Sequence, residues 1–193
     1  IYFMCLSSNV FATSMDCKNW LKDSIGCAKG VSSFAWGNNT YVAVGADIVV
    51  SSDADSWTNY FLENFDKNIY SVIYHNNMFI GVGSGKYVGD SSAIFSSNDG
   101  IKWTYKNFSA KVRLCEIIHA NNQYIAVGDD GTIITSPDGI EWIQQNSGTI
   151  GSLSSIAYGN GIYIATGGDY DENLILTSSD GYKWTDRSID SST

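Results

Sequence analysis

The chain has 193 residues, of which 44 % are apolar and 16 % charged, so it can bury a core and differs from a disordered chain. A formal net charge of −9 at pH 7 disfavours binding to nucleic acid or to an anionic membrane surface. The apolar stretches are far shorter than the roughly 18 to 20 residues that span a bilayer, so we expect no membrane insertion.

Five of the six tryptophans recur along the chain at spacings of 37, 46, 39 and 42 residues. A period of about 40 residues is typical of one four-stranded propeller blade. Each of these tryptophans ends a Ser-x-Asp-Gly-x-x-Trp pattern or a close variant, at 14–20, 51–57, 97–103, 136–142 and 178–184. Because Ser and Asp side chains accept N–H groups of their own turn, each pattern predicts a tight turn ahead of a strand that begins at Trp.

A second repeated pattern lies upstream of the last four tryptophans. Two short apolar runs flank an Asn-Asn or Asn-Gly pair, at 38–39, 76–77, 121–122 and 160–161. Such pairs favour type I′ turns, because both central residues must take a positive φ. Each pattern therefore predicts a β-hairpin.

Taken in chain order, these elements predict an all-β propeller of four-stranded antiparallel blades, about five in number, forming a single domain over 1–193. The five blades are expected to be either part of a larger propeller or a small ring that closes through its ends. The expected blades are a partial blade 1 at 1–22, blade 2 at 31–60, blade 3 at 69–106, blade 4 at 114–145 and blade 5 at 153–187. Open edges of such blades expose unpaired N–H and C=O groups, so self-association through them is a further expectation.

Residues 1–12 also resemble the end of a signal peptide, but the repeat accounts for them better. Residues 13–20 align without a gap with 135–142, which places Tyr2 on Tyr124. No basic segment precedes the apolar residues. The alignment therefore predicts that the chain begins inside the second strand of a blade.

These motifs resemble the Asp-box (BNR-like) repeats of secreted or surface β-propellers, which are similar in plan to WD40/YVTN-like repeats. The resemblance covers nearly the whole chain and implies that the Asp and Trp of each motif are structural. It also implies an extracellular or cell-surface location. The implied structural pairs are Asp16 and Trp20, Asp53 and Trp57, Asp99 and Trp103, Asp138 and Trp142, and Asp180 and Trp184.

The irregular segments between the motifs are expected to share one face of the propeller, opposite the regular turns. They are 21–31, 60–70, 84–92, 105–115, 144–154 and 168–173, and they hold most of the basic residues, such as Lys67, Lys106 and Arg113. Function usually lies on variable loops held by a rigid scaffold, so we expect a non-catalytic module that binds a protein or glycan here. The candidate ligand-binding residues are Tyr87, Asp90, Arg113, Asp129, Asp130, Asp169, Tyr170 and Asp171.

Two other functions remain open. A carbohydrate hydrolase or lyase would need a carboxylate pair, for which Glu116, Asp129 and Asp130 are candidates. Resemblance to sialidases implies three substrate-binding arginines, but the chain has only Arg113 and Arg187, so at most a fragment of such an enzyme is expected. The second open function is that of an assembly factor, because similar repeats also occur in photosystem II assembly factors.

Metal ligands and cofactor motifs are weak in this sequence. Residues 169–173 begin like a calcium loop but lack the Gly and the distant Glu of an EF-hand. Cys115 and His119 are too few to form a zinc site, and His119 replaces an aromatic residue of the other repeats, which favours a packing role. We therefore expect no metal, no cofactor and no catalytic residue.

Overall fold

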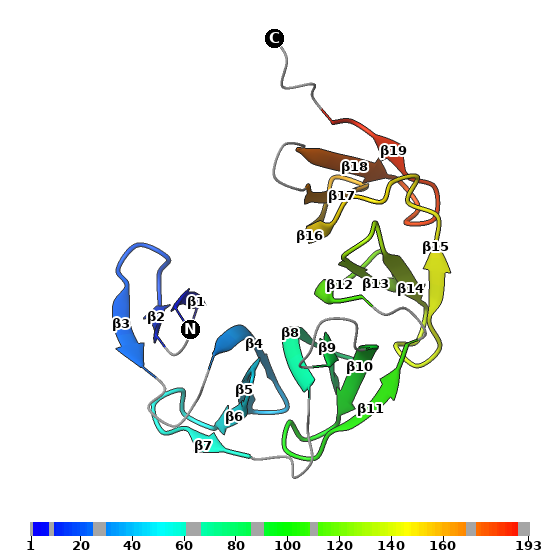
Figure 1. The fold of residues 1–193 in the computed structure, drawn as a ribbon. Coiled ribbons are helices and arrows are strands. Elements are labelled where there is room, and N and C mark those ends of the chain that lie inside the picture. The colour runs from blue at the N-terminus through cyan, green and yellow to red at the C-terminus, as the bar shows by residue number, and fades with distance from the viewer. Residues whose placement is uncertain are drawn as a thin grey trace. The chain divides into compact units, whose positions relative to one another are not determined.

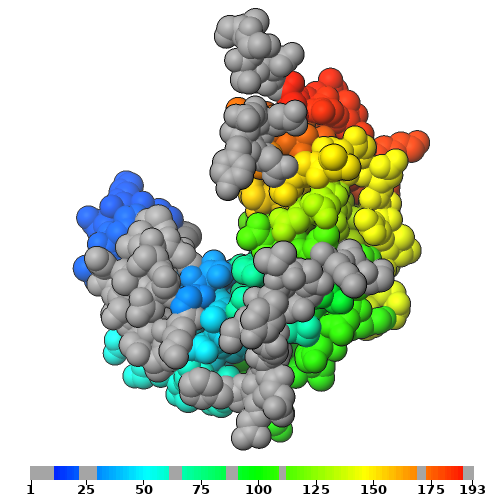
Figure 2. Space-filling view, viewed as in Figure 1, coloured from blue at the N-terminus to red at the C-terminus, as the bar shows by residue number. Residues whose placement is uncertain are grey.

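All the regular structure of the described residues consists of β-strands. The computed structural model describes residues 2–7, 10–24, 30–60, 67–85, 91–108, 112–168 and 173–188 (Figure 1). The remaining residues are grey in Figure 2. The strands form one three-stranded sheet and four four-stranded sheets, which confirms the all-β, propeller-like fold. Among these residues there is no helix of the length and hydropathy needed to cross a membrane.

The chain forms two compact units, residues 1–81 with 94–106 and residues 82–93 with 107–193, and each is described by itself. The first unit contains the sheet of β1 (Tyr2–Ser7), β2 (Val10–Ser14) and β3 (Leu21–Ser24), and the sheet of β4 (Val31–Gly37), β5 (Thr40–Gly45), β6 (Ile48–Ser51) and β7 (Thr58–Asn59).

The sheet of β8 (Lys67–His75), β9 (Met78–Gly85), β10 (Ser92–Ser97) and β11 (Thr104–Asn107) has residues in both units. The second unit contains the sheet of β12 (Leu114–Ala120), β13 (Gln123–Gly128), β14 (Ile133–Ser136) and β15 (Ile143–Gln145), and that of β16 (Leu153–Gly159), β17 (Ile162–Gly167), β18 (Leu174–Ser178) and β19 (Thr185–Asp186). The expected grouping of these sheets into a single domain stays a prediction.

The first sheet has the register that the repeat predicts. Tyr2 on β1 lies opposite Ser14 on β2, as Tyr124 lies opposite Ser136 in a complete sheet. Residues 2–7 therefore occupy the second-strand position of a repeat, and the sheet has three strands as expected.

The asparagine pairs form the predicted turns. Asn38 and Asn39 have φ values of 49° and 56°, and Asn160 and Gly161 have 50° and 80°. The pairs at 76–77 and 121–122 also have positive φ at both residues. Because Asn tolerates the left-handed region better than most residues, these pairs fix the register of the first two strands in each of the four four-stranded sheets.

The Ser-x-Asp turns are held by their own side chains. Asp138 Oδ1 accepts hydrogen bonds from the N–H groups of Ile140 (2.8 Å) and Glu141 (3.0 Å), and from the Ser136 hydroxyl (3.0 Å). The equivalent bonds recur at Asp16, Asp53, Asp99 and Asp180. These bonds stabilise the ionised carboxylate, so the pKa of each Asp lies below its ordinary value.

The last strand of each sheet begins one residue later than predicted. β7, β11, β15 and β19 start at the residue that follows Trp, and the indole stays with the turn. The indole Nε1–H of Trp142 donates to the backbone carbonyl of Gly139 at 3.1 Å, and the indoles of Trp103 and Trp184 donate in the same way to Gly100 and Gly181, at 2.8 and 3.0 Å. In these three turns the bond holds the indole against the turn.

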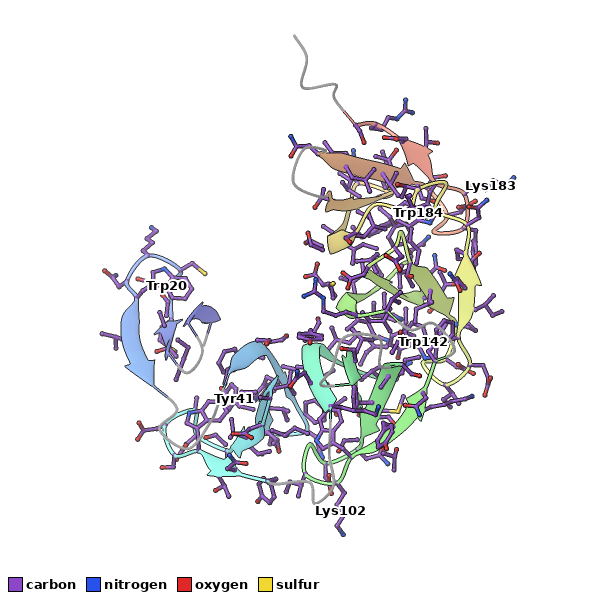
Figure 3. All side chains as sticks on the ribbon, viewed as in Figure 1. Trp20, Tyr41, Lys102, Trp142, Lys183 and Trp184 are labelled. Atoms are coloured by element: carbon purple, nitrogen blue, oxygen red, sulfur yellow. The ribbon has the colours of Figure 1, made fainter. Side chains whose placement is uncertain are left out.

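The tryptophans lie at the margin of the sheets, not in the core. Trp57, Trp103, Trp142 and Trp184 are partly buried, and Trp20 is 37 % exposed. Figure 3 shows Lys183 projecting outward, whereas Trp184, the next residue, lies inward of it among other side chains. The rings of Tyr124 and Trp142 are 6.3 Å apart. Each indole therefore joins a turn to the edge of the core.

Consecutive sheets pack face to face within each unit. In the first unit Phe11 contacts Phe34 and Trp57, at ring distances of 5.5 and 6.2 Å, across β2 and the sheet β4–β7. In the second unit Ile125, Val127 and Ile133 of the sheet β12–β15 pack against Leu153, Ile156, Tyr163, Ala165, Leu174 and Leu176 of the sheet β16–β19. The first strands adjoin: β4 contacts β8, and β12 contacts β16.

Candidate functional site

Three of the eight predicted ligand-binding residues are described by the structure. Tyr87, Asp90, Asp169, Tyr170 and Asp171 lie outside the described residues. Arg113 precedes β12, and Asp129 and Asp130 follow β13. Because β12 and β13 are antiparallel neighbours, the three residues meet at one end of the sheet β12–β15.

Arg113 and Asp129 are joined by both backbone and side-chain contacts. The N–H of Asp129 donates to the carbonyl of Arg113 at 2.9 Å. The Arg113 Nη2 atom lies 3.1 Å from Asp129 Oδ1, and their side chains are 52 % and 28 % exposed. The guanidinium is therefore positioned by the sheet and still open to solvent.

The turn that carries Asp129 and Asp130 is firmly closed. Gly128 donates to the carbonyl of Thr132 at 2.9 Å, and Thr132 donates to that of Asp129 at 3.0 Å. Asp130 has a φ of 54° and is exposed. The turn presents a carboxylate on a backbone that has little freedom to move.

The connection between β15 and β16 supports this turn from the side. Gly131 donates to the carbonyl of Gly151 at 3.0 Å. It has a φ of 63°, and a Cβ there would collide with the Thr149 carbonyl oxygen. Only glycine allows this approach of the two segments.

The same backbone bridge occurs in other sheets without the charged side chains. Ala46 donates to the carbonyl of Gly30 at 3.3 Å, and Gly168 donates to that of Ser152 at 2.8 Å. These pairs occupy the positions of Asp129 and Arg113 in their own repeats. The ion pair is therefore a local addition to a repeated scaffold, which is how a binding surface is usually built on a rigid fold.

Cys115 lies beneath this ion pair. Its Sγ atom is 3.8 Å from Asp129 Oδ1 and 3.9 Å from the carbonyl oxygen of Arg113. Burial raises the pKa of the Cys115 thiol, so the sulfur is protonated at neutral pH. We assign it a packing role.

Glu116 does not join Asp129 and Asp130, because its carboxylate is bound to the next sheet. Its Oε2 accepts hydrogen bonds from the Ser155 hydroxyl (2.7 Å) and the Ile156 N–H (2.6 Å). This contact is part of the sheet packing. A hydrolase that uses Glu116 stays a prediction. To act in a catalytic carboxylate pair, Glu116 would have to break its hydrogen bonds to Ser155 and Ile156.

Two of the basic residues that were expected on loops lie on strands. Lys67 begins β8 and Lys106 lies in β11, so this expectation was wrong. Lys67 Nζ is 5.1 Å from the ring centroid of Tyr105. A lysine can lie along an aromatic strand face while its ammonium group stays in water, which accounts for a basic residue inside a strand.

Three other features of the described residues were considered as sites. His119 packs edge-on against Tyr124 at 4.5 Å, as expected for a packing residue. A hollow of about 420 Å³ lies on the β2–β3 hairpin, lined by Thr13, Ser14, Met15, Asp16, Asn19 and Leu21. Within the described ranges, no three His, Cys, Asp or Glu side chains are grouped so that they could hold a metal ion.

Comparisons with known proteins identify the fold but no family. No protein-family model matches the chain, and no curated protein matches it. Solved propeller structures resemble it. The structure of Ycf48 bound to a D1 peptide has a TM-score of 0.67 at 15 % identity, over 95 % of this chain and 63 % of that one. Ycf48 from Cyanidioschyzon merolae has a TM-score of 0.59 at 19 % identity, over 84 % and 57 %.

Virginiamycin B lyase from Staphylococcus aureus is also similar, with a TM-score of 0.74 at 12 % identity, over 96 % of this chain and 64 % of the lyase. The chain thus spans less than two thirds of each of these structures. At such identities the likeness concerns the β-propeller fold alone.

Proposed function

We propose that the chain is a non-catalytic propeller-like module that binds a protein segment at the end of the sheet β12–β15, around Arg113, Asp129 and Asp130. The observation that carries this proposal is the Arg113 guanidinium, which is fixed by Asp129 at 3.1 Å and yet 52 % exposed. A guanidinium already held in place loses less conformational freedom when a ligand binds.

The chemistry of these groups suits a peptide of mixed charge. A guanidinium has five N–H donors that match carboxylates and backbone carbonyls. The exposed Asp130 provides an acceptor for amide or ammonium groups. The net charge of −9 disfavours a strongly acidic ligand. A short segment with both a carboxylate and a basic residue therefore fits this surface best.

Two further observations support a binding role. The motif aspartates accept the N–H groups of their own turns, so their carboxylates are engaged in the fold. One of the similar structures is Ycf48 in complex with a D1 peptide, which is a property of that protein. We carry over from it only the idea that a fold of this kind takes a peptide.

We also infer that the five Ser-x-Asp turns are of the Asp-box type, as their sequences suggest. The recurring pair of backbone N–H bonds to each Asp supports this inference, and so does the indole bond to the turn carbonyl at Trp103, Trp142 and Trp184. On it rests the proposal of an extracellular or cell-surface location.

The experiment is a binding screen against synthetic peptides that carry a free C-terminal carboxylate, with C-amidated copies and a glycan array beside them. We expect binding to a subset of the peptides, and a loss of ~10-fold or more in affinity in Arg113→Ala. Arg187→Ala is the matched control, because it removes the same charge from the exposed segment after β19. Urea unfolding of both variants checks that the fold is intact.

Two results would contradict the proposal. One is peptide binding with the same affinity in Arg113→Ala and in Arg187→Ala. The other is binding to glycans and to no peptide, which would favour the glycan alternative.

A further inference from the structure

The outer face of β17 is exposed where the same face of other sheets is buried. Ile164 of β17 is 43 % exposed. The residues at its position in the repeat are Val42 of β5, Ile80 of β9 and Ile125 of β13, and each is 0 % exposed. Ile162, two residues before, is 44 % exposed, whereas Gln123 at its position is 6 % exposed.

Within each unit, a Ser-x-Asp turn of the next sheet covers this face. In the second unit, a Cβ placed on Gly181 would lie 2.7 Å from both Ile125 Cδ1 and Gln123 Nε2. The same Gln123 amide donates to the carbonyl of Asp180 at 2.7 Å. The turn at 178–184 therefore sits directly on the second strand of the sheet before it.

The first unit repeats this contact. A Cβ on Gly100 would lie 2.5 Å from Val42 Cγ2 and 3.7 Å from Thr40 Cγ2. Val42 is the counterpart of Ile125, and Gly100 is the counterpart of Gly181. The packing of a turn against the second strand of the preceding sheet therefore occurs in both units.

The turn after β2 has the same backbone conformation as these turns, but the residue at its contact position is exposed to solvent. Cys17 occupies the glycine position of the turn after β2, with a φ of 59°, and it is an exposed free thiol. Its counterparts Ala54, Gly100, Gly139 and Gly181 are all buried. Asp16 nevertheless makes the usual bonds, to the N–H groups of Lys18 (2.9 Å) and Asn19 (2.8 Å).

We propose that the β17 face of one copy of this chain binds the β2–β3 turn of a second copy, in the way that β13 binds the turn at 178–184. Both surfaces have the backbone structure that this contact needs. In each of them, the contact residue (Ile164 or Cys17) is exposed, whereas the residues at the same position of the other described repeats are buried. Ala54 shows that a side chain with a Cβ is tolerated in a covered turn, since it is only 9 % exposed. The contact is head-to-tail, so it leads to a ring or a chain of copies.

Disulfide cross-linking tests this contact between two copies directly. Ile164→Cys is introduced together with Cys5→Ser, Cys27→Ser and Cys115→Ser, so that Cys17 is the partner thiol. If Cys17 lies on residue 164 as Gly100 lies on Val42, where a Cβ on Gly100 would be 2.5 Å from Val42 Cγ2, the two Cβ atoms are separated by at most one further C–C bond, which is within the reach of a disulfide. We expect cross-linked dimers and larger species on a non-reducing gel after mild oxidation, and their loss when Cys17→Ser is added.

Ile140→Cys in the same background is the matched control, since Ile140 is also apolar and 61 % exposed but lies on the turn after β14. Cross-linking of Ile140→Cys to the same extent would overturn the proposal, and so would a disulfide that forms within a single chain.

Sedimentation provides a test that does not depend on cysteine replacement. In reducing buffer the wild-type chain is expected to increase in mass with concentration, and Ile164→Asp is expected to sediment as the 21.1 kDa monomer. Ile150→Asp, at a residue that is 88 % exposed, is expected to behave like the wild type. A wild-type chain that remains monomeric up to ~100 μM, a concentration at which a weak micromolar contact would be populated, would overturn the proposal.

Discussion

The carboxylate of Glu116 on β12 accepts a hydrogen bond from the backbone N–H of Ile156 on β16, at 2.6 Å. The same contact occurs in the first unit, where the hydroxyl of Ser33 on β4 accepts from the N–H of Val72 on β8 at 3.2 Å. Ser33 and Glu116 share one position of the repeat. A side chain at this position therefore joins the first strands of consecutive sheets, whether it is charged or neutral.

Replacing Glu116 should accordingly reduce stability in proportion to what remains of this bond. Glu116→Ala leaves the partly buried Ile156 N–H without its acceptor, at a cost of about 1–3 kcal/mol in the free energy of unfolding. Glu116→Ser copies Ser33, which accepts the equivalent N–H, and should therefore lose much less stability than Glu116→Ala. Urea unfolding of the two variants measures the difference. If both lower the stability equally, the serine is not acting as an acceptor and the repeated contact is not what matters.

The turn aspartates make stability depend on pH in the acid range. Hydrogen bonds from the Ser56 and Asp55 N–H groups, and then from the Ser51 hydroxyl, lower the pKa of Asp53 to about 2. A carboxyl whose pKa is lower in the folded state stabilises the fold above its unfolded pKa of about 3.9, and this contribution is lost as the pH falls through about 2. We therefore expect the Tm to fall steadily between pH 4 and pH 2.

Asp53→Asn isolates this effect, because the amide oxygen can accept the same bonds but does not titrate. The variant should have a lower Tm than the wild type at pH 6, and the gap should narrow as the pH falls to 2. Asp55→Asn is the control, because Asp55 contributes its backbone N–H to the turn. A gap between wild type and Asp53→Asn that stays constant over this range would mean that the turn does not select the ionised carboxylate.

The tryptophan of a Ser-x-Asp turn should contribute less to the free energy of unfolding than an aromatic residue in the core. Trp142 is only partly buried, and it contributes its N–H bond to Gly139 and its contact with Tyr124. We expect Trp142→Ala to cost about 2–3 kcal/mol, below the ~3–5 kcal/mol of a fully buried tryptophan. Trp142→Phe retains the ring contact and should cost ~1 kcal/mol for the lost hydrogen bond. Urea unfolding measures both losses of stability. If Trp142→Ala and Trp142→Phe lose the same free energy of unfolding, the stabilisation comes from the hydrogen bond alone.

The local parts of the fold could be predicted from the sequence because neighbouring residues determine them. The pairs at 38–39 and 160–161 needed a positive φ at both residues, and Asp138 found its partners within three residues. Repetition strengthened each of these inferences, since a turn that occurs several times is unlikely to arise by chance.

The contacts between repeats could not be predicted in the same way. Glu116 was named with Asp129 and Asp130 as a candidate for a carboxylate pair, and its carboxylate binds Ser155, 39 residues further along the chain. Which side chain reaches the next sheet depends on the twist and packing of both sheets, and a single sequence does not specify these. The pairing of Arg113 with Asp129, 16 residues apart, likewise depends on β12 and β13 ending together. The shared repeat position of Ser33 and Glu116 was the signal that could have indicated the role of Glu116.

Substituting glycine in two turns separates backbone strain from packing between sheets. Gly161 and Gly181 have nearly the same φ, 80° and 79°. A Cβ on Gly161 meets nothing within 4 Å, whereas one on Gly181 would lie 2.7 Å from Ile125 Cδ1. Gly161→Ala should therefore cost only the strain of a left-handed alanine, about 1–2 kcal/mol. Gly181→Ala carries the same strain and also crowds β13, which adds about 1–3 kcal/mol.

Ile125→Val in the Gly181→Ala background tests the origin of the added cost. Removing the Cδ1 methyl relieves the collision, so the second substitution should recover part of the stability lost in the first. In the wild-type background the same change removes a buried methyl and should cost ~1 kcal/mol. Equal unfolding free energies for Gly161→Ala and Gly181→Ala would show that the turn at 178–184 does not press on β13, and would also remove the template for the contact between copies.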